Sequence, residues 1–364
     1  MTSVVLIDAG RSAIIPDDPD LPETPTGLAE DVIRALLRRT CLDQSELTEL
    51  FLADPRCLST GRSAGRPGWV FDRPPLDLTT TVGTNSAWSL AQAVRTIEQN
   101  PEMIAVVAAT DFGLGSGHSH TGAELYLRQH TARVVAAWWD VASDEMAGWA
   151  RSSYTRSAEC SAAGDFAAEI VSSTPGYLAD CFHKPVASDA FTGWAGAGTV
   201  PEHDFIDDGL VVTAHPARGA SAIILAGEQN AIRLGLRYRA RLQATRAVRA
   251  SSEFGIAPLG PHAVDELLAP CGLDFGGLDQ LEVPEQYAVT PVAWMKETGI
   301  SEFLVNPRGG DLAFGHLPRS GRLRSLVTML NSLEDTGGRA GALVASDAHR
   351  TTAFVLTVPD HHCS

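Results

Sequence analysis

The chain has 364 residues, of which 44% are hydrophobic and 20% are charged, proportions that are ordinary for a globular protein. Its formal net charge of −16 at pH 7 argues against nucleic acid as a partner, because phosphate backbones are bound by clustered lysines and arginines. The same charge argues against binding to an anionic membrane surface. The length suits two domains or one large duplicated domain.

The cysteines and histidines form no metal or redox motif. The six cysteines are scattered, and no two of them make a Cys-x-x-Cys pair. His118-Ser-His120 lacks a third ligand, so we expect a flexible loop there and no metal site. The first residues have a buried-strand pattern without the charged segment of a signal peptide, and no apolar run has membrane-spanning length. We therefore expect a cytoplasmic protein with reduced thiols.

Strand-like and helix-like segments alternate from the start of the chain. Val4–Asp8 has the pattern of a strand buried on both faces. A helix is predicted from about Leu28 to Arg39, and Leu47–Ala53 is the next predicted strand. This alternation indicates an α/β fold with a largely parallel sheet.

A turn at Gly83 separates a short β-type run from an amphipathic helix. The run is Thr79–Val82, and a second β-type run, Ile104–Ala109, follows the helix. The residues at the helix start offer capping side chains, and they are Thr84, Asn85 and Ser86. The apolar face has helical spacing and consists of Ala87, Leu90, Ala91, Val94 and Ile97. A residue at such a turn lies beside a helix N-terminus, where negative charge is favoured and a cysteine would be reactive.

The remainder divides into an insertion and a second alternating half. Residues from Asp111 to Val200 are rich in Gly, Ser, Ala and His and resemble an insertion. The alternation restarts beyond residue 230 and continues with the late strands Gly341–Ala345 and Thr352–Thr357. We therefore predict an N-terminal half over 1–230, with an insertion at about 112–205, and a C-terminal half over 231–364. Their similar patterns suggest a duplicated fold.

Four segments of the chain resemble the thiolase superfamily, which includes thiolases and ketosynthases. They are Thr79–Ile97, Leu281–Ala288, Asn306–Gly321 and Gly341–Thr352. The resemblance covers nearly the whole chain. It implies duplicated α/β halves with central, mostly parallel sheets and an inserted loop domain. It also implies a large dimerisation face near the sheet edge at Ile104.

The most specific match is Gly315-His316. In the family this histidine helps to bind the thioester oxygen and activates the nucleophile. A neutral imidazole N–H aimed at a developing enolate oxygen suits this chemistry. The family's His-Pro order is altered here to His316-Leu317-Pro318. The alternative is a structural histidine in a glycine-rich turn.

Other functional positions of the family carry different residues in this chain. Gly83 stands where the family has its acyl-accepting cysteine, so Gly83 and Gly315 offer only backbone groups to an oxyanion. Pro284 stands where the family has a water-holding asparagine, and proline cannot donate a hydrogen bond. Ser346 replaces a second, acid/base cysteine, and its hydroxyl is a far weaker acid than a thiol with a pKa of about 8.5. His349 is a candidate for that proton-transfer role, or it fills the pocket.

Two hydroxyls are candidate substitutes for the missing thiol. Thr84 and Ser86 would act as nucleophiles if a base such as His316 were adjacent, and the alternative for both is helix capping. Asn85, Tyr287 and Arg319 are candidate substrate-binding residues, although Tyr287 also fits a packing role. A basic group for a phosphate-bearing ligand consists of Arg308, Arg319, Arg322 and Arg324, with solvated surface arginines as the alternative.

These features favour an enzyme that acts on acyl thioesters, either of CoA or of carrier-bound phosphopantetheine, without a cysteine acyl-enzyme. It would be a decarboxylase or C–C lyase that stabilises an enolate, or an acyltransferase, and it would need no further cofactor. The alternatives are a catalytically inactive subunit of a heteromeric thiolase or ketosynthase complex, and a binding protein for CoA or a carrier arm. We expect a homodimer or a heteromer. The composition, rich in Ala, Arg and Gly, suits a high-GC bacterium. Beyond what composition indicates, we expect a role in a specialised biosynthetic pathway.

Overall fold

The computed structural model describes residues 3–16, 27–53, 79–83, 85–111, 130, 132–172, 180, 214, 217–244, 248–249, 266–346 and 350–359. Its strands are β1 (Val4–Ser12), β2 (Ile15–Pro16), β3 (Glu49–Ala53), β4 (Thr79–Val82), β5 (Ile104–Asp111), β6 (Ile170–Ser172), β7 (Ala217–Gly227), β8 (Ala240–Ala244), β9 (Val248–Arg249), β10 (Gln280–Glu282), β11 (Ala340–Ser346) and β12 (Arg350–Thr357). Its helices are α1 (Leu28–Thr40), α3 (Ser86–Gln99), α5 (Ser143–Ala163), α6 (Glu228–Arg233), α8 (Val289–Thr298), α9 (Asp311–Phe314) and α10 (Gly321–Thr336). Short 3₁₀ helices cover Gln44–Glu46, Ala269–Cys271, Phe275–Gly277 and Glu302–Leu304.

The two halves of the chain repeat one pattern of strand pairing. The strand order is β10-β11-β12-β8-β1-β7-β5-β3-β4. Outward from β1, the pairs with β7 and then β5 are antiparallel, and the next pair, β5 with β3, is parallel. Outward from β8, the pairs with β12 and then β11 are antiparallel, and the next pair, β11 with β10, is parallel. The repeated pattern agrees with the predicted duplication, and β1 and β8 join the halves.

The predicted α/β class is confirmed, but the sheet is mixed. The inner pairs are antiparallel, so the prediction of largely parallel strands was wrong. The pair of β11 and β12 shows one physical reason for this antiparallel pairing, because only a few residues connect the two strands. Such a short connection can only join antiparallel strands, because a parallel pair needs a crossover of about a dozen residues or more.

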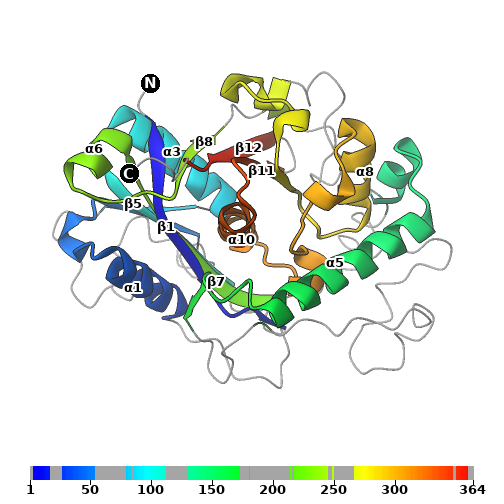
Figure 1. Cartoon of the computed structure of the whole chain (residues 1–364), viewed down its shortest axis with the longest axis horizontal. Helices are drawn as coiled ribbons and strands as arrows, with labels where there is room; N and C mark the ends of the chain where they lie inside the picture. Colours follow the sequence, from blue (N-terminus) through cyan, green and yellow to red (C-terminus); the bar gives the residue numbers. More distant parts are fainter. Residues whose placement is uncertain are drawn as a thin grey trace.

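Two helices, α3 from the first half and α10 from the second, lie in the middle of the molecule (Figure 1). α3 and α10 share one apolar core with side chains of β1, β5, β7, β8, β11 and β12. α1 covers the opposite face of the first half, and α8 covers the opposite face of the second. Because side chains alternate along a strand, Val107 faces α3 whereas Val106 faces α1.

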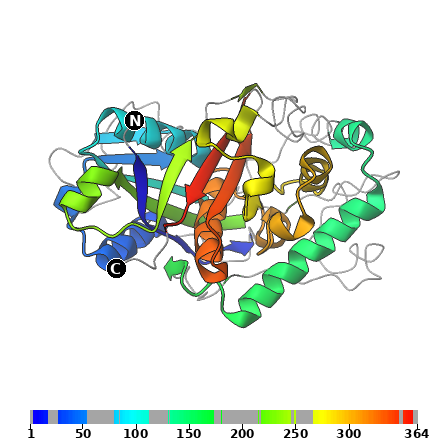
Figure 2. The same cartoon turned by 45° about the horizontal axis from the view of Figure 1, so that its top comes forward.

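The predicted insertion is described in part. Its helix α5 runs along one side of the molecule in both views (Figures 1 and 2). The strand β6 returns to the sheet and pairs in parallel with β1. The His118-Ser-His120 motif lies outside the described residues. Within the ranges that the structure describes, no helix has the length and apolarity that crossing a membrane requires, and no three His, Cys, Asp or Glu side chains gather as metal ligands.

Candidate active site

The turn between β4 and α3 is closed around Gly83. The Gly83 N–H donates to the carbonyl of Leu52 over 2.8 Å, which continues the pairing of β4 with β3. A Cβ at this position would lie 2.4 Å from Cε3 of Trp88 and 2.5 Å from Oγ of Ser89. The position therefore excludes any side chain as the turn now stands. An oxyanion role for the Gly83 N–H requires its bond to Leu52 to open.

The helix α3 begins at this turn with a side-chain cap. The carboxamide oxygen of Asn85 accepts from the Trp88 N–H over 2.9 Å, so Asn85 is the N-cap residue. Ser86 follows as the first helical residue, and its hydroxyl is fully buried without a hydrogen-bond partner in the described part of the chain. Its N–H donates to the carbonyl of Arg319 over 2.9 Å. The first turn of α3 thus touches the segment that carries His316, whereas Thr84 lies outside the described residues.

The His316 segment is anchored at both ends. α9 ends at Gly315, whose φ of +94° is a conformation that favours glycine. The carbonyl of His316 accepts from the Ala217 N–H over 3.1 Å, which ties it to the start of β7. The N–H of Gly315 donates to the Asp311 carbonyl over 2.8 Å, so this amide is occupied within the short helix.

Asp111, at the end of β5, fixes the far end of the segment. Its carboxylate accepts from the Ser320 N–H over 2.8 Å, from the Ser320 hydroxyl over 2.7 Å, and from the Arg319 N–H over 3.2 Å. Burial raises the pKa of Asp111, while the Ser320 hydrogen bonds and the charge of Arg319 oppose that rise. This role of Asp111 was not predicted from the sequence. The available signal was an acidic residue two positions after the apolar run Ile104–Ala109.

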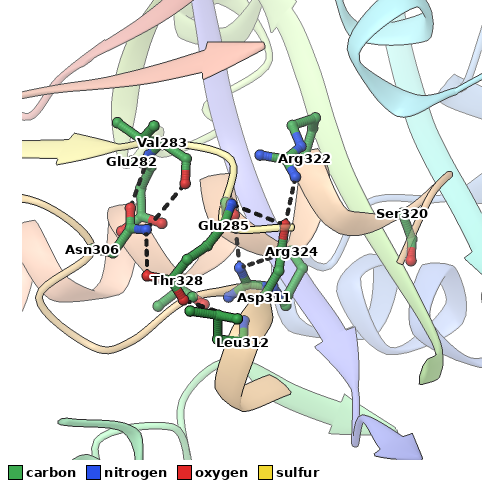
Figure 3. Close-up of polar contacts among 12 residues, drawn as sticks. Glu282, Val283, Glu285, Asn306, Asp311, Leu312, Ser320, Arg322, Arg324 and Thr328 are labelled. Atoms are coloured by element: carbon green, nitrogen blue, oxygen red, sulfur yellow. Dashed lines mark hydrogen bonds and ion pairs between the residues drawn. The ribbon is translucent and has the colours of Figure 1, made fainter. Parts of the chain in front are cut away.

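A carboxylate next to His316 holds two arginines (Figure 3). Asp311 pairs with Nη2 of Arg322 over 2.8 Å and with Nη2 of Arg324 over 3.2 Å. Burial by itself would raise the pKa of Asp311, but the charges of Arg322, Arg324 and His316 outweigh it and lower the pKa. Asp311 is therefore an ionised group that interacts electrostatically with His316.

Glu285 ties the segment after β10 to α9 and α5. Its carboxyl accepts from Ser153 Oγ over 2.6 Å, from Trp149 Nε1 over 2.7 Å, and from the Leu312 N–H over 3.2 Å. Asn306 donates to the same carboxyl over 3.1 Å, as part of the contacts drawn in Figure 3. Burial raises the pKa of Glu285, and these donors oppose the rise. The network positions the segment that also carries Pro284.

The remaining predicted residues have structural contacts. Ser346 Oγ lies 2.9 Å from Thr351 Oγ1 across the β11–β12 pair, and His349 lies outside the described residues. Tyr287 is buried in the core beneath α8, in agreement with a packing role. Arg319 lies with Nη1 3.6 Å from Asp111.

The four arginines predicted as a basic group are paired with acids. Arg308 is buried and binds Asp335 and the Asp165 carbonyl. Arg319 pairs with Asp111, and the other two pair with Asp311. Three of the four guanidinium groups are held by the buried carboxylates of Asp111 and Asp311, so they are not solvated surface arginines.

Comparisons with known proteins give a consistent result. The family described as "Thiolase, C-terminal domain" matches residues 236–357. The steroid 3-ketoacyl-CoA thiolase FadA6 of Mycobacterium tuberculosis is 26% identical over 94% of this chain and 90% of its own length. An acetyl-CoA acetyltransferase of Chromobacterium violaceum is 26% identical over 93% of this chain and 95% of its own length.

Solved structures show the same fold. The human mitochondrial 3-ketoacyl-CoA thiolase in complex with CoA has a TM-score of 0.80 at 18% identity and covers 98% of each chain. The Bacillus anthracis acetyl-CoA acetyltransferase has a TM-score of 0.79 at 17% identity and covers 99% of each chain. Residues 236–357 therefore match the thiolase C-terminal domain, the chain is similar over nearly its whole length to thiolases, and its fold is that of the solved thiolase structures.

Proposed function

We propose that the protein acts on acyl thioesters, and that His316 supplies the hydrogen bond or proton that stabilises negative charge on the thioester oxygen. The observation that carries the proposal is the contact between Ser86 N–H and Arg319 O, which brings the first turn of α3 against the His316 segment. A helix N-terminus and a histidine then act on the same small region. The named substrates of the relatives, 3-ketoacyl-CoA and acetyl-CoA, support a CoA thioester as the ligand.

Enolate stabilisation without an acyl-enzyme is the reaction type that requires the fewest catalytic groups from this chain. Decarboxylation or C–C cleavage of an activated thioester forms an enolate whose oxygen needs donors rather than a nucleophile. Acyl transfer would require Thr84 or Ser86 as the nucleophile, with His316 as its base. The Ser86 hydroxyl is fully buried and has no hydrogen-bond partner among the described residues, and this observation keeps the second route in the proposal. His349 and Ser346 remain proton-transfer candidates, and Asn85, Arg319 and Tyr287 substrate-contact candidates.

The experiment is a panel of acyl-CoA and malonyl-CoA thioesters, with released CoA followed over time and the intact protein mass measured in parallel. Release of CoA or CO₂ without a mass adduct supports catalysis around His316, and a stable adduct on Thr84 or Ser86 supports acyl transfer. The variant His316→Ala should lose turnover while it keeps the wild-type melting temperature. Undiminished turnover in His316→Ala would refute the role of the histidine.

A second candidate function is a catalytically inactive subunit of a heteromeric complex. The closed turn favours it, because Trp88 and Ser89 fill the space that a side chain at residue 83 would need. A homodimer or a heteromer with a thiolase-like partner belongs to both candidates. No turnover by the isolated chain, together with turnover after a thiolase-like partner is added, would select the subunit function.

The division of the chain stays part of the proposal. We place the halves at 1–230 and 231–364, with the insertion at about 112–205, and the family match from residue 236 supports the boundary between them. A cytoplasmic location and a role in specialised biosynthesis also belong to this proposal, on the basis of cysteine usage and composition.

A further inference from the structure

Two guanidinium groups in the first turn of α10 converge on one carboxylate. Arg322 and Arg324 each place an Nη2 on Asp311, at 2.8 and 3.2 Å (Figure 3). The first turn of α10 contains no acidic residue. Cations are disfavoured at a helix N-terminus, which already carries partial positive charge. The arrangement therefore concentrates positive charge where helix stability does not call for it.

The neighbouring acids do not balance this charge. Asp311 has a lowered pKa and is ionised, so it compensates one of the two guanidinium groups. Burial raises the pKa of Glu282 to about 8, and burial also raises the pKa of Glu285. Both glutamates are thus shifted toward their neutral forms. Among the described residues, Asp311 is the one acid that Arg322 and Arg324 contact, so two guanidinium groups share a single carboxylate.

Three N–H groups of these two guanidinium groups could donate a hydrogen bond to a further acceptor. Nη1 of Arg322 and both Nε and Nη1 of Arg324 are buried without a hydrogen-bond partner in the ranges that the structure describes. A buried donor left unpaired costs about 1–3 kcal/mol, and more when the group is charged. Arg324 is the foremost cation acting on Glu282, whose Oε2 also has no hydrogen-bond partner in the described part of the chain. Arg322 therefore has the donor best placed for a further acceptor, and its side chain keeps 15% of its surface exposed.

This donor lies beside the candidate active site. Arg322 and His316 both act electrostatically on Asp311. Arg322 also stands two residues after Ser320, which Asp111 holds at the end of the His316 segment. An anion on Arg322 would thus be a neighbour of a thioester polarised by His316.

We propose that Arg322 binds a free carboxylate on the acyl chain of the substrate, so that the ligand is a dicarboxylic acyl thioester of the malonyl type. This inference rests on the proposed function of the same site. A guanidinium group matches a carboxylate in shape and charge, and hydrogen bonds between charged partners are the strong ones. An acetyl-type chain would leave the buried donor unpaired, so it binds less tightly.

The test is calorimetric titration of the full chain with malonyl-CoA, acetyl-CoA and CoA, with mass spectrometry to verify that the thioester is intact. Wild type should bind malonyl-CoA at least about tenfold more tightly than acetyl-CoA. Arg322→Met should lose this preference and keep its acetyl-CoA affinity, and Arg322→Lys should be intermediate, because lysine keeps the charge but loses the planar fork. Arg233→Met, which removes a surface arginine on α6, is the matched control and should behave as wild type.

The outcomes separate this inference from the proposed function. Binding of acetyl-CoA and malonyl-CoA with equal affinity by wild type, or a preference that persists in Arg322→Met, overturns the carboxylate site and leaves the proposed function standing. If no thioester binds, the proposed function fails. The carboxylate site is then tested separately, by measuring melting temperatures with free malonate. Malonate that raises the melting temperature of wild type but not of Arg322→Met supports the site, and its effect on Arg322→Lys should be intermediate. Malonate that has no such effect overturns it.

Discussion

The closed turn at Gly83 makes a quantitative prediction about packing. In the variant Gly83→Ala, the new methyl group would lie 2.4 Å from Cε3 of Trp88 and 2.5 Å from Oγ of Ser89. Ordinary contacts between carbon atoms are about 3.5–4.0 Å, so the neighbours would have to move by about 1 Å. Overpacking of this kind typically costs about 1–3 kcal/mol. We expect Gly83→Ala to lower the free energy of unfolding by that amount.

The same substitution should be harmless once the space is opened. In the background Trp88→Ala with Ser89→Ala, both colliding groups are gone. Gly83 does not have a positive φ, so alanine fits its backbone. An alanine that fits stabilises by about 0.4–1 kcal/mol, because it restricts the unfolded chain. The coupling between residue 83 and its two neighbours should therefore be about 1.5–4 kcal/mol.

Urea unfolding followed by circular dichroism measures this coupling, provided that the slope with denaturant is unchanged among the variants. Gly148→Ala is the matched control, since Gly148 lies inside α5 and a Cβ there would meet no atom within 4 Å. It should stabilise the protein slightly. A cost of Gly83→Ala that is equal in both backgrounds would show that Trp88 and Ser89 do not close the turn, and a cysteine at residue 83 would then also be accommodated.

Three further predictions concern buried polar groups near the site. Glu282 has a folded pKa of about 8, above its unfolded value, so the unfolded chain releases its proton first as pH rises. Wild type should then lose stability between about pH 4.5 and pH 8, by up to about 1.4 kcal/mol per pH unit, relative to Glu282→Gln; parallel pH profiles of the two proteins would contradict this. Asp111→Ala should unfold more easily by about 1–3 kcal/mol or more, because the Ser320 N–H and hydroxyl lose their acceptor, and Asp111→Asn should recover part of the loss. Gly309→Ala should destabilise more than Gly83→Ala in thermal melts, since Gly309 has a φ of +78° and a Cβ would lie 1.9 Å from Ser157 Oγ.

The sequence predicted the elements that periodicity specifies. α3 was expected from the spacing of its apolar residues, and Leu90, Val94 and Ile97 are indeed buried on one face. The strands β1, β5 and β11 followed from apolar runs in the same way. The α/β class was therefore available from local patterns. Strand direction was not, because an apolar run has the same composition in a parallel and in an antiparallel pair.

Residues of the candidate active site were predictable only where they belong to a recognisable sequence motif. Gly315-His316 located the segment, but no spacing along the chain indicated that Asp111, which is 208 residues before Arg319, holds its far end. Arg322 and Arg324 were predicted as part of a basic group, with a solvated surface as the alternative. Their pairing with Asp311 was not predicted, because it depends on how α9 packs against α10. The collision at Gly83 likewise depends on the rotamers of two residues in the following helix. Such contacts arise from tertiary packing, which spacing along the chain does not encode.

The duplicated architecture explains why these groups meet where they do. α3 and α10 are the two central helices, one from each half, and they share a single core. The first residue of α3 donates to Arg319, which stands two residues before the start of α10. The positive ends of two helix dipoles therefore approach each other at the His316 segment, and both favour negative charge there. A thioester oxygen and a carboxylate on the acyl chain would each be stabilised at this junction. An enolate formed in the proposed reaction would be stabilised by these two helix ends without a cysteine at the turn.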